Sequence, residues 1–191
     1  TREQWKQFMG DEDGFARWED HIDSLLEVAS RGCDTACKRR FYAASETRYY
    51  TARSSDVLWL PDDLLSITTL KTDEDDDGTY EITWTTSDYV LHPRNADLDG
   101  KPYYQILTAS DGDYSFPRTR DGVQLVGSFG YSETTPPEIV EATLEISARL
   151  FKRKDAPLGV LAGGEFEAAR IAGSDPDVTR LLSSFRLKRL G

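Results

Sequence analysis

Apolar residues recur at a helical period in the first third of the chain. From Phe15 onward, i, i+3, i+4 spacing places the large apolar side chains on one stripe, which predicts a helix ending near Gly32. Asp34 suits the N-cap of a second helix that reaches Phe41 or Ala44. Residues 1–13 are polar and acidic, and we expect an arm or a frayed helix there. The stripe consists of Phe15, Trp18, Ile22, Leu25, Leu26 and Ala29.

The last third of the chain returns to the helical period. Pro137 suits the first turn of a helix and Thr135 its cap, so residues 137–153 are predicted to be helical. A break follows at 156–159, and Asp175 suits the cap of a final helix that begins at Pro176. The apolar positions of these two helices are Ile139, Ala142, Ile146, Leu150, Phe151, Val178, Leu181, Leu182 and Phe185.

The middle of the chain changes to short apolar or alternating runs separated by turn residues, which is typical of strands. Pro61 closes one run, and Gly127 and Gly130 in the last run indicate bulges or a close approach of backbones. The strands are expected at 47–53, 57–60, 64–70, 79–85, 89–91, 103–107 and 123–131. Their spacing predicts a small antiparallel β unit.

Together these patterns predict an α+β protein in which N- and C-terminal helices form a helical bundle that carries an inserted small antiparallel β unit. The expected parts are an N-terminal arm at 1–14, a helical body from 15–48 and 132–185, an inserted β domain at 49–131 and a C-terminal tail at 186–191.

Charge is distributed unevenly along the chain. The 191 residues carry a formal net charge of −11, which argues against a protein that coats nucleic acid over its whole surface. Residues 49–148 hold six basic and 19 acidic side chains, whereas 31–48 and 149–191 are net basic. Two interpretations stay open: an ordinary surface variation, or complementary surfaces between copies of the chain or toward a partner.

Composition narrows the class of protein further. No apolar run approaches the roughly 20 residues that a membrane span needs, and no signal-peptide core opens the chain, so we expect no membrane contact. With two cysteines, a disulfide-framework scaffold is excluded. Cys33 and Cys37 are interpreted as small packing residues, because no second pair completes a metal site.

Candidate chemistry is sparse, and we expect no catalytic, cofactor-binding or metal-binding residues. His21 is interpreted as an exposed residue at the rim of a helix. Asp73, Asp75, Asp77 and Gly78 match the opening of a calcium loop, but the twelfth position is Trp84 where a bidentate Glu is required. A solvated hairpin loop is therefore predicted. Nucleophile elbows and phosphate-binding glycine motifs are missing from the sequence.

The aromatic residues of the β unit leave a second class of function open. A carbohydrate-binding or hydrolytic module would use Trp84, Tyr89, Tyr103 and Tyr104 as a platform. Packing of these side chains across strands and in the core is the favoured interpretation.

The order of several short segments resembles a known family. The segments are Ile22 to Leu26, Lys38 to Tyr42, Glu46 to Tyr49, Leu58 to Pro61 with Asp63 to Ser66, Trp84 with Asp88 to Leu91 and Pro93, Phe129 to Tyr131 with Pro136 and Pro137, Arg149 to Pro157, and Asp175 to Val178. In this layout the chain resembles the head–tail connector (adaptor) proteins of tailed bacteriophages, the neck ring beneath the portal.

The resemblance implies a non-enzymatic virion protein, assembled in the host cytoplasm as a twelve-fold ring between portal and tail. Its partners would be the portal protein, further copies of itself, a stopper or tail-completion protein, and genomic DNA that passes through the channel without sequence-specific binding. Another neck component, such as a stopper or tail terminator, is the remaining alternative. The basic tail is expected to dock on the portal through Arg186, Leu187, Lys188, Arg189 and Leu190, and Lys152, Arg153 and Lys154 to contact a ring neighbour or partner.

Overall fold

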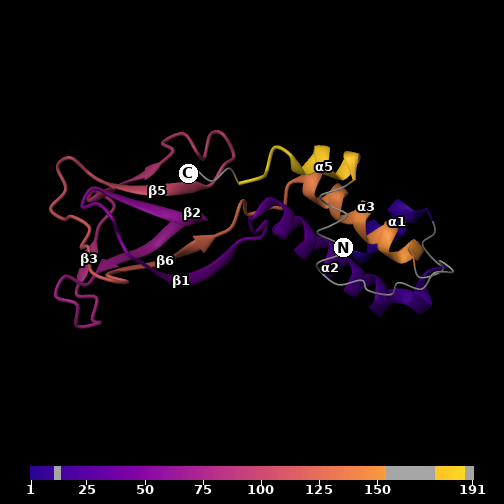
Figure 1. Cartoon of the computed structure of the whole chain (residues 1–191), viewed down its shortest axis with the longest axis horizontal. Helices are drawn as coiled ribbons and strands as arrows, with labels where there is room; N and C mark the ends of the chain where they lie inside the picture. Colours follow the sequence, from indigo (N-terminus) through magenta and orange to yellow (C-terminus); the bar gives the residue numbers. More distant parts are fainter. Residues whose placement is uncertain (11–13, 154–174, 188–191) are drawn as a thin grey trace. The chain divides into compact units, whose positions relative to one another are not determined.

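The computed structural model of the chain describes residues 1–10, 14–153 and 175–187. It contains helices and one six-stranded antiparallel sheet, so the predicted α+β class is confirmed (Figure 1). The chain divides into two compact units. One combines Thr1–Arg39 with Pro136–Gly191, and the other is the continuous stretch Arg40–Thr135. We call them the helical unit and the β unit.

The N-terminal residues, for which an arm or a frayed helix was expected, form a capped and packed helix. Helix α1, Arg2–Met9, begins with a capping box at Thr1 and ends at Gly10 in the left-handed conformation. Trp5 is 0% exposed and lies edge-on to Phe151, with ring centroids 5.0 Å apart. Lys6 pairs with Glu19 of the next helix at 2.6 Å, and Arg2 pairs with Glu19 and Asp23.

Helix α2, Glu19–Cys37, follows a short 3-10 turn at Ala16–Trp18 and is one continuous element. The predicted stop at Gly32 and the predicted second helix from Asp34 are therefore wrong. Gly32 is buried inside the helix, and Cys33 Sγ lies 3.7 Å from Thr143 Oγ1 on a neighbouring helix. This packing outweighs the low helix propensity of glycine. The helix ends where Lys38 adopts a left-handed φ of 55°.

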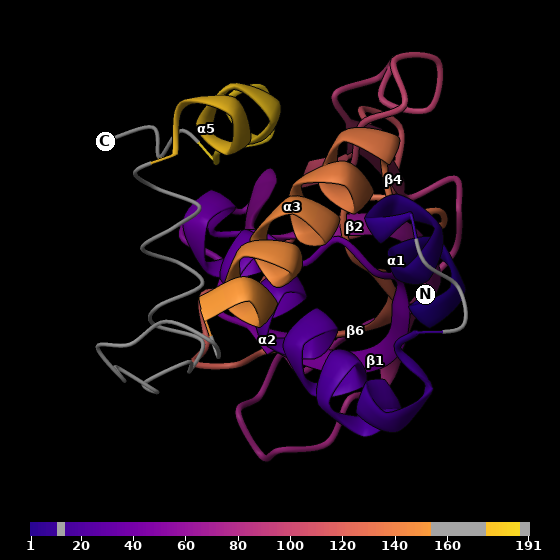
Figure 2. The same cartoon turned by 90° about the vertical axis from the view of Figure 1, so that its right-hand side faces the viewer.

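The C-terminal helices agree with the sequence pattern. Helix α3, Pro137–Arg153, has the predicted limits, and α5, Pro176–Leu182, is capped by Asp175, whose carboxylate accepts the N–H groups of Asp177 and Val178. Helix α3 packs against α2, and α5 packs against α3 (Figure 2). Among the described helices, none is long and apolar enough to span a membrane.

The sheet of the β unit has the strand order β1-β6-β2-β5-β4, with β3 paired to β2. The predicted runs at 57–60 and 64–70 are a single long strand, because Pro61 lies exposed within β2 where its register with β5 shifts. A shift of this kind tolerates proline. The strands are β1 Ala44–Tyr50, β2 Val57–Thr72, β3 Ile82–Trp84, β4 Tyr89–His92, β5 Tyr103–Thr108 and β6 Val123–Phe129.

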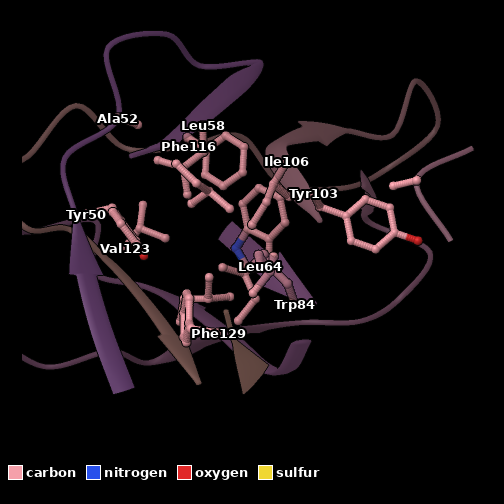
Figure 3. Close-up of a cluster of buried hydrophobic side chains, with 14 residues drawn as sticks. Tyr50, Ala52, Leu58, Leu64, Trp84, Tyr103, Ile106, Phe116, Val123 and Phe129 are labelled. Carbon is pink, nitrogen blue, oxygen red and sulfur yellow. The ribbon is translucent and has the colours of Figure 1, made fainter. Parts of the chain in front are cut away.

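A separate hydrophobic core fills the β unit (Figure 3). Trp84 stacks on Phe116 with centroids 4.7 Å apart, and its indole N–H donates to Thr72 Oγ1 at 3.1 Å. The close approach predicted at Gly127 is confirmed, because a Cβ there would lie 2.2 Å from the backbone oxygen of Ser66. Any larger residue at 127 would push β2 and β6 apart.

We expect Trp5→Ala to lower the free energy of unfolding by about 3–5 kcal/mol, because it removes a fully buried aromatic side chain and leaves a cavity. Chemical denaturation followed by far-UV circular dichroism measures this. Phe8→Ala on the same helix is the control, since Phe8 is 42% exposed and should cost less than about 1 kcal/mol. Equal losses for both variants would contradict the packed position of α1.

Candidate partner-contact surfaces

The first candidate surface is the C-terminal end of α3. Lys152 and Arg153 are exposed there, and cations at this end interact favourably with the helix dipole. The preceding residue, Phe151, is buried among aromatic rings, with centroids 5.5 Å from Phe15 and 6.1 Å from Trp18. The basic pair therefore projects from a well-packed turn. Lys154, predicted to act with this pair, lies outside the described residues.

The second candidate surface is the start of the C-terminal tail. The Leu187 backbone N–H donates to the Cys37 carbonyl at 2.9 Å, and Phe185 is buried. This bond satisfies a carbonyl that the end of α2 would otherwise leave unpaired. Arg186 is exposed between these two anchors. The remaining tail residues of the prediction, Lys188, Arg189 and Leu190, lie outside the described part of the chain.

The two basic surfaces lie at opposite ends of α2. Phe151 contacts Trp18 just before the helix begins, whereas Leu187 contacts Cys37, its last residue. A helix of 19 residues is about 28 Å long. The structure therefore does not bring the described members of the two predicted groups together.

A carboxylate beside α5 carries a perturbed pKa. Desolvation raises the pKa of Glu145, with the nearby acidic groups Asp177 and Glu141 acting in the same direction and Arg149 opposing them. Glu145 Oε2 is buried and lies 3.9 Å from the Arg149 guanidinium, too far for a hydrogen bond. Arg149 instead pairs with Asp175, the residue that caps α5.

The acidic loop after β2 is organised around one buried carboxylate. Asp73 is 3% exposed and accepts the backbone N–H groups of Asp76 and Gly78, each at 2.9 Å. Ligand oxygens of Asp73, Asp75 and Glu81 lie within 4.8 Å of one another. Each residue offers one oxygen to this group, and three oxygens are fewer than the six to eight that coordinate calcium. Glu81, which corresponds to the ninth position of the calcium loop, was not among the predicted residues.

The predicted aromatic platform is divided between the core and the surface. Trp84 is 5% and Tyr103 8% exposed, so packing, the favoured interpretation, is confirmed for both, and Tyr89 packs against the same core. Tyr104 is exposed, and its ring stacks with Trp59 at a centroid distance of 6.4 Å. The pairing of Trp59 with Tyr104 was not predicted, because it depends on the register between β2 and β5.

The remaining candidate residues occupy the positions that the sequence indicated. His21 is exposed, and both cysteines are buried. Burial raises the pKa of Cys33 to about 12 and that of Cys37 to about 11. A thiol of such high pKa is a poor nucleophile and metal ligand at neutral pH, which agrees with a packing role.

Charged side chains at the start of the β unit form a network that the sequence did not reveal. Arg48 pairs with Glu46 at 2.7 Å and also with Asp62, and Arg40 pairs with the same Glu46. The Arg48 guanidinium lies 4.4 Å from the centre of the Phe129 ring. The network connects residues from 40 to 62, and no local motif could have predicted it.

Comparison with solved structures finds a similar fold in chains of gene transfer agent particles. A chain from the neck of an empty gene transfer agent particle, computed with C6 symmetry, matches 100% of this chain and 90% of its own length with a TM-score of 0.61 at 17% identity. This chain has the fold of a neck component. A neck chain from the native particle, computed with C12 symmetry, matches 93% of this chain and 90% of its own length at a TM-score of 0.56 and 17% identity.

A third similar chain comes from the virion of the native gene transfer agent particle, with a TM-score of 0.56 at 16% identity over 91% of this chain and 80% of that one. No protein-family model matches this chain, and no curated protein matches it either. At these identities the likeness is one of fold, and it extends over both the helical and the β unit.

We expect Glu145→Gln to stabilise the protein at pH 7 but not at pH 4. A carboxyl group with a raised pKa in the folded state loses stability as the pH rises above its unfolded pKa, about 4.3. The amide cannot ionise, so this loss disappears. Melting temperatures from pH 4 to pH 7 measure the effect, with Glu138→Gln at an exposed position of α3 as the control. A melting temperature unchanged at pH 7 would argue against the desolvation.

Proposed function

We propose that this protein is a structural, non-enzymatic component of the neck of a tailed phage or phage-like particle. The observation that carries the proposal is the match to a neck chain over 100% of this chain and 90% of the other. A match of this extent includes the helical unit, the β unit and the order in which the chain enters and leaves them. Partial similarity to a common β fold would not reproduce that order.

Within the neck, the proposed role is that of a head–tail connector, or adaptor, which forms a ring on the portal and joins the capsid to the tail. Necks solved with C6 and C12 symmetry support a cyclic homo-oligomer, and twelve copies are proposed. The proposed partners are the portal protein, neighbouring copies and a stopper or tail-completion protein. The virion neck is the proposed location, after assembly in the host cytoplasm.

The charge of the β unit supports a role beside translocating DNA. Residues 40–135 contain 17 acidic and eight basic side chains, a net charge of −9. A surface of this sign repels the phosphate backbone, so DNA could slide past without being bound.

The two basic surfaces receive separate roles in this proposal. Residues 186–190 dock on the portal, and Lys152, Arg153 and Lys154 contact a ring neighbour or another neck protein. The separation of the surfaces along α2 supports this division, because each surface can engage a different partner at the same time.

Electron microscopy of the purified protein, alone and mixed with the portal of its own phage, tests the proposed function. We expect rings of cyclic symmetry stacked coaxially on the portal. Saturable binding of a glycan with no assembly under either condition would instead favour the carbohydrate-binding alternative.

We expect the double variant Lys188→Glu and Arg189→Glu to reduce co-sedimentation with the portal at least about tenfold, because charge reversal replaces attraction with repulsion at the docking site. The fold should be unaffected, since the anchoring bond of Leu187 to Cys37 is retained. Arg120→Glu is the control, because the Arg120 side chain is 91% exposed on the β unit. Undiminished docking of the double variant would refute the role of the tail.

A further inference from the structure

Strand β1 forms one edge of the sheet and, apart from two charged side chains, lacks the features that usually protect an edge. It is seven residues long and pairs with β6 in continuous register from Ala44 opposite Phe129 to Tyr50 opposite Val123. It contains no proline, glycine or lysine, and no bulge interrupts it. In the described part of the chain no strand other than β6 pairs with it (Figure 1). Such an edge offers unpaired backbone groups to another strand.

The charges on β1 do not repel an incoming strand. Glu46 and Arg48 neutralise each other, and their ion pairs with Arg40 and Asp62 lie within the same unit. The alternate side chains, Ser45, Thr47 and Tyr49, are exposed and uncharged. A unit with a net charge of −9 therefore keeps this edge free of net charge, although charged residues are the commonest means of blocking an edge.

The opposite edge of the sheet is β4, which pairs only with β5 among the described strands. Its four residues include no Asp, Glu, Lys or Arg, and all four are half-buried. Leu91 packs against the core of the β unit, so the alternating Val90 faces the other side of the sheet. Among the described residues the sheet thus has two unlike free edges, one on β1 and one on β4.

A cyclic ring requires a contact between two unlike surfaces of the same chain, because pairing of identical surfaces produces a two-fold dimer and then stops. The two sheet edges are a pair of unlike surfaces with complementary backbone groups. We propose that the free edge of β1 in one copy pairs with the free edge of β4 in the next, so that the sheets of neighbouring copies join. This inference rests on the proposed ring, and it identifies one contact that would close it.

Chemical cross-linking of the full-length protein tests the contact. In the variant Thr47→Cys and Val90→Cys, both new thiols lie on the face of the sheet that points away from the core, and a short bis-maleimide should join neighbouring copies. We expect a ladder of cross-linked species up to the size of the ring. Each single variant should give no ladder, and an equimolar mixture of the two should give dimers only. The wild-type protein, whose two cysteines are buried, is the control.

Mass photometry of the same samples separates this inference from the proposed function. Rings without cross-links in the double variant would overturn the edge contact and leave the neck role intact. Cross-linking of Thr47→Cys alone would also overturn it, in favour of symmetric pairing of two β1 strands. Failure of the wild-type protein to assemble, alone or on the portal, would count against both.

A second pair of variants tests the edge without new thiols. Lysine at the exposed positions Ser45 and Thr47 should raise the concentration needed for half-assembly about tenfold, because lysines on an edge strand oppose pairing. The matched control places lysines at Ser66 and Thr68, which are exposed on the central strand β2. Both variants should melt like the wild-type protein. Equal effects on assembly would overturn the edge contact.

Discussion

The contact between α2 and α3 is the interaction on which the rest of the architecture depends. These helices come from the two ends of the chain, and their packing, through contacts such as that between Cys33 and Thr143, makes one unit of them. The 96 residues of the β unit are an insertion in the sequence between these two helices. Closing a loop of this length costs entropy only in proportion to the logarithm of its length, so the helical unit can carry an insertion of this size.

The parts of the fold that could be predicted from the sequence are those encoded locally. Helix α3 has its predicted limits because Pro137 starts it and one apolar stripe continues to Phe151. The cap of α5 at Asp175 could also be predicted, because it depends only on residues next to it in the sequence. The errors arose where distant contacts decided the outcome. Gly32 does not end α2, because the buried stripe continues through it against α3, and Pro61 does not end β2, because a register shift accommodates it.

The candidate surfaces also include features that the local sequence predicts and features that it does not. Exposure of Lys152 and Arg153 follows from their place after the last buried residue of α3, which the helical period predicts. The contact of Leu187 with Cys37 links residues 150 positions apart, and the network around Glu46 joins two strands and a loop, so neither has a local signature. The free edges of β1 and β4 depend on strand order, which hydrophobic periodicity does not determine.

In the proposed neck role the protein would leave the cell inside a particle, and the burial of both cysteines would then have a consequence. Outside a cell, a protein meets dissolved oxygen and the disulfides of other proteins, and no reductase can repair damage. Cys33 and Cys37 sit on the inner side of α2 with thiols that stay protonated at neutral pH. Oxidants and disulfides react with the thiolate form, so these two side chains react slowly. The helical unit therefore keeps its packing in oxidising surroundings without needing a cross-link of its own.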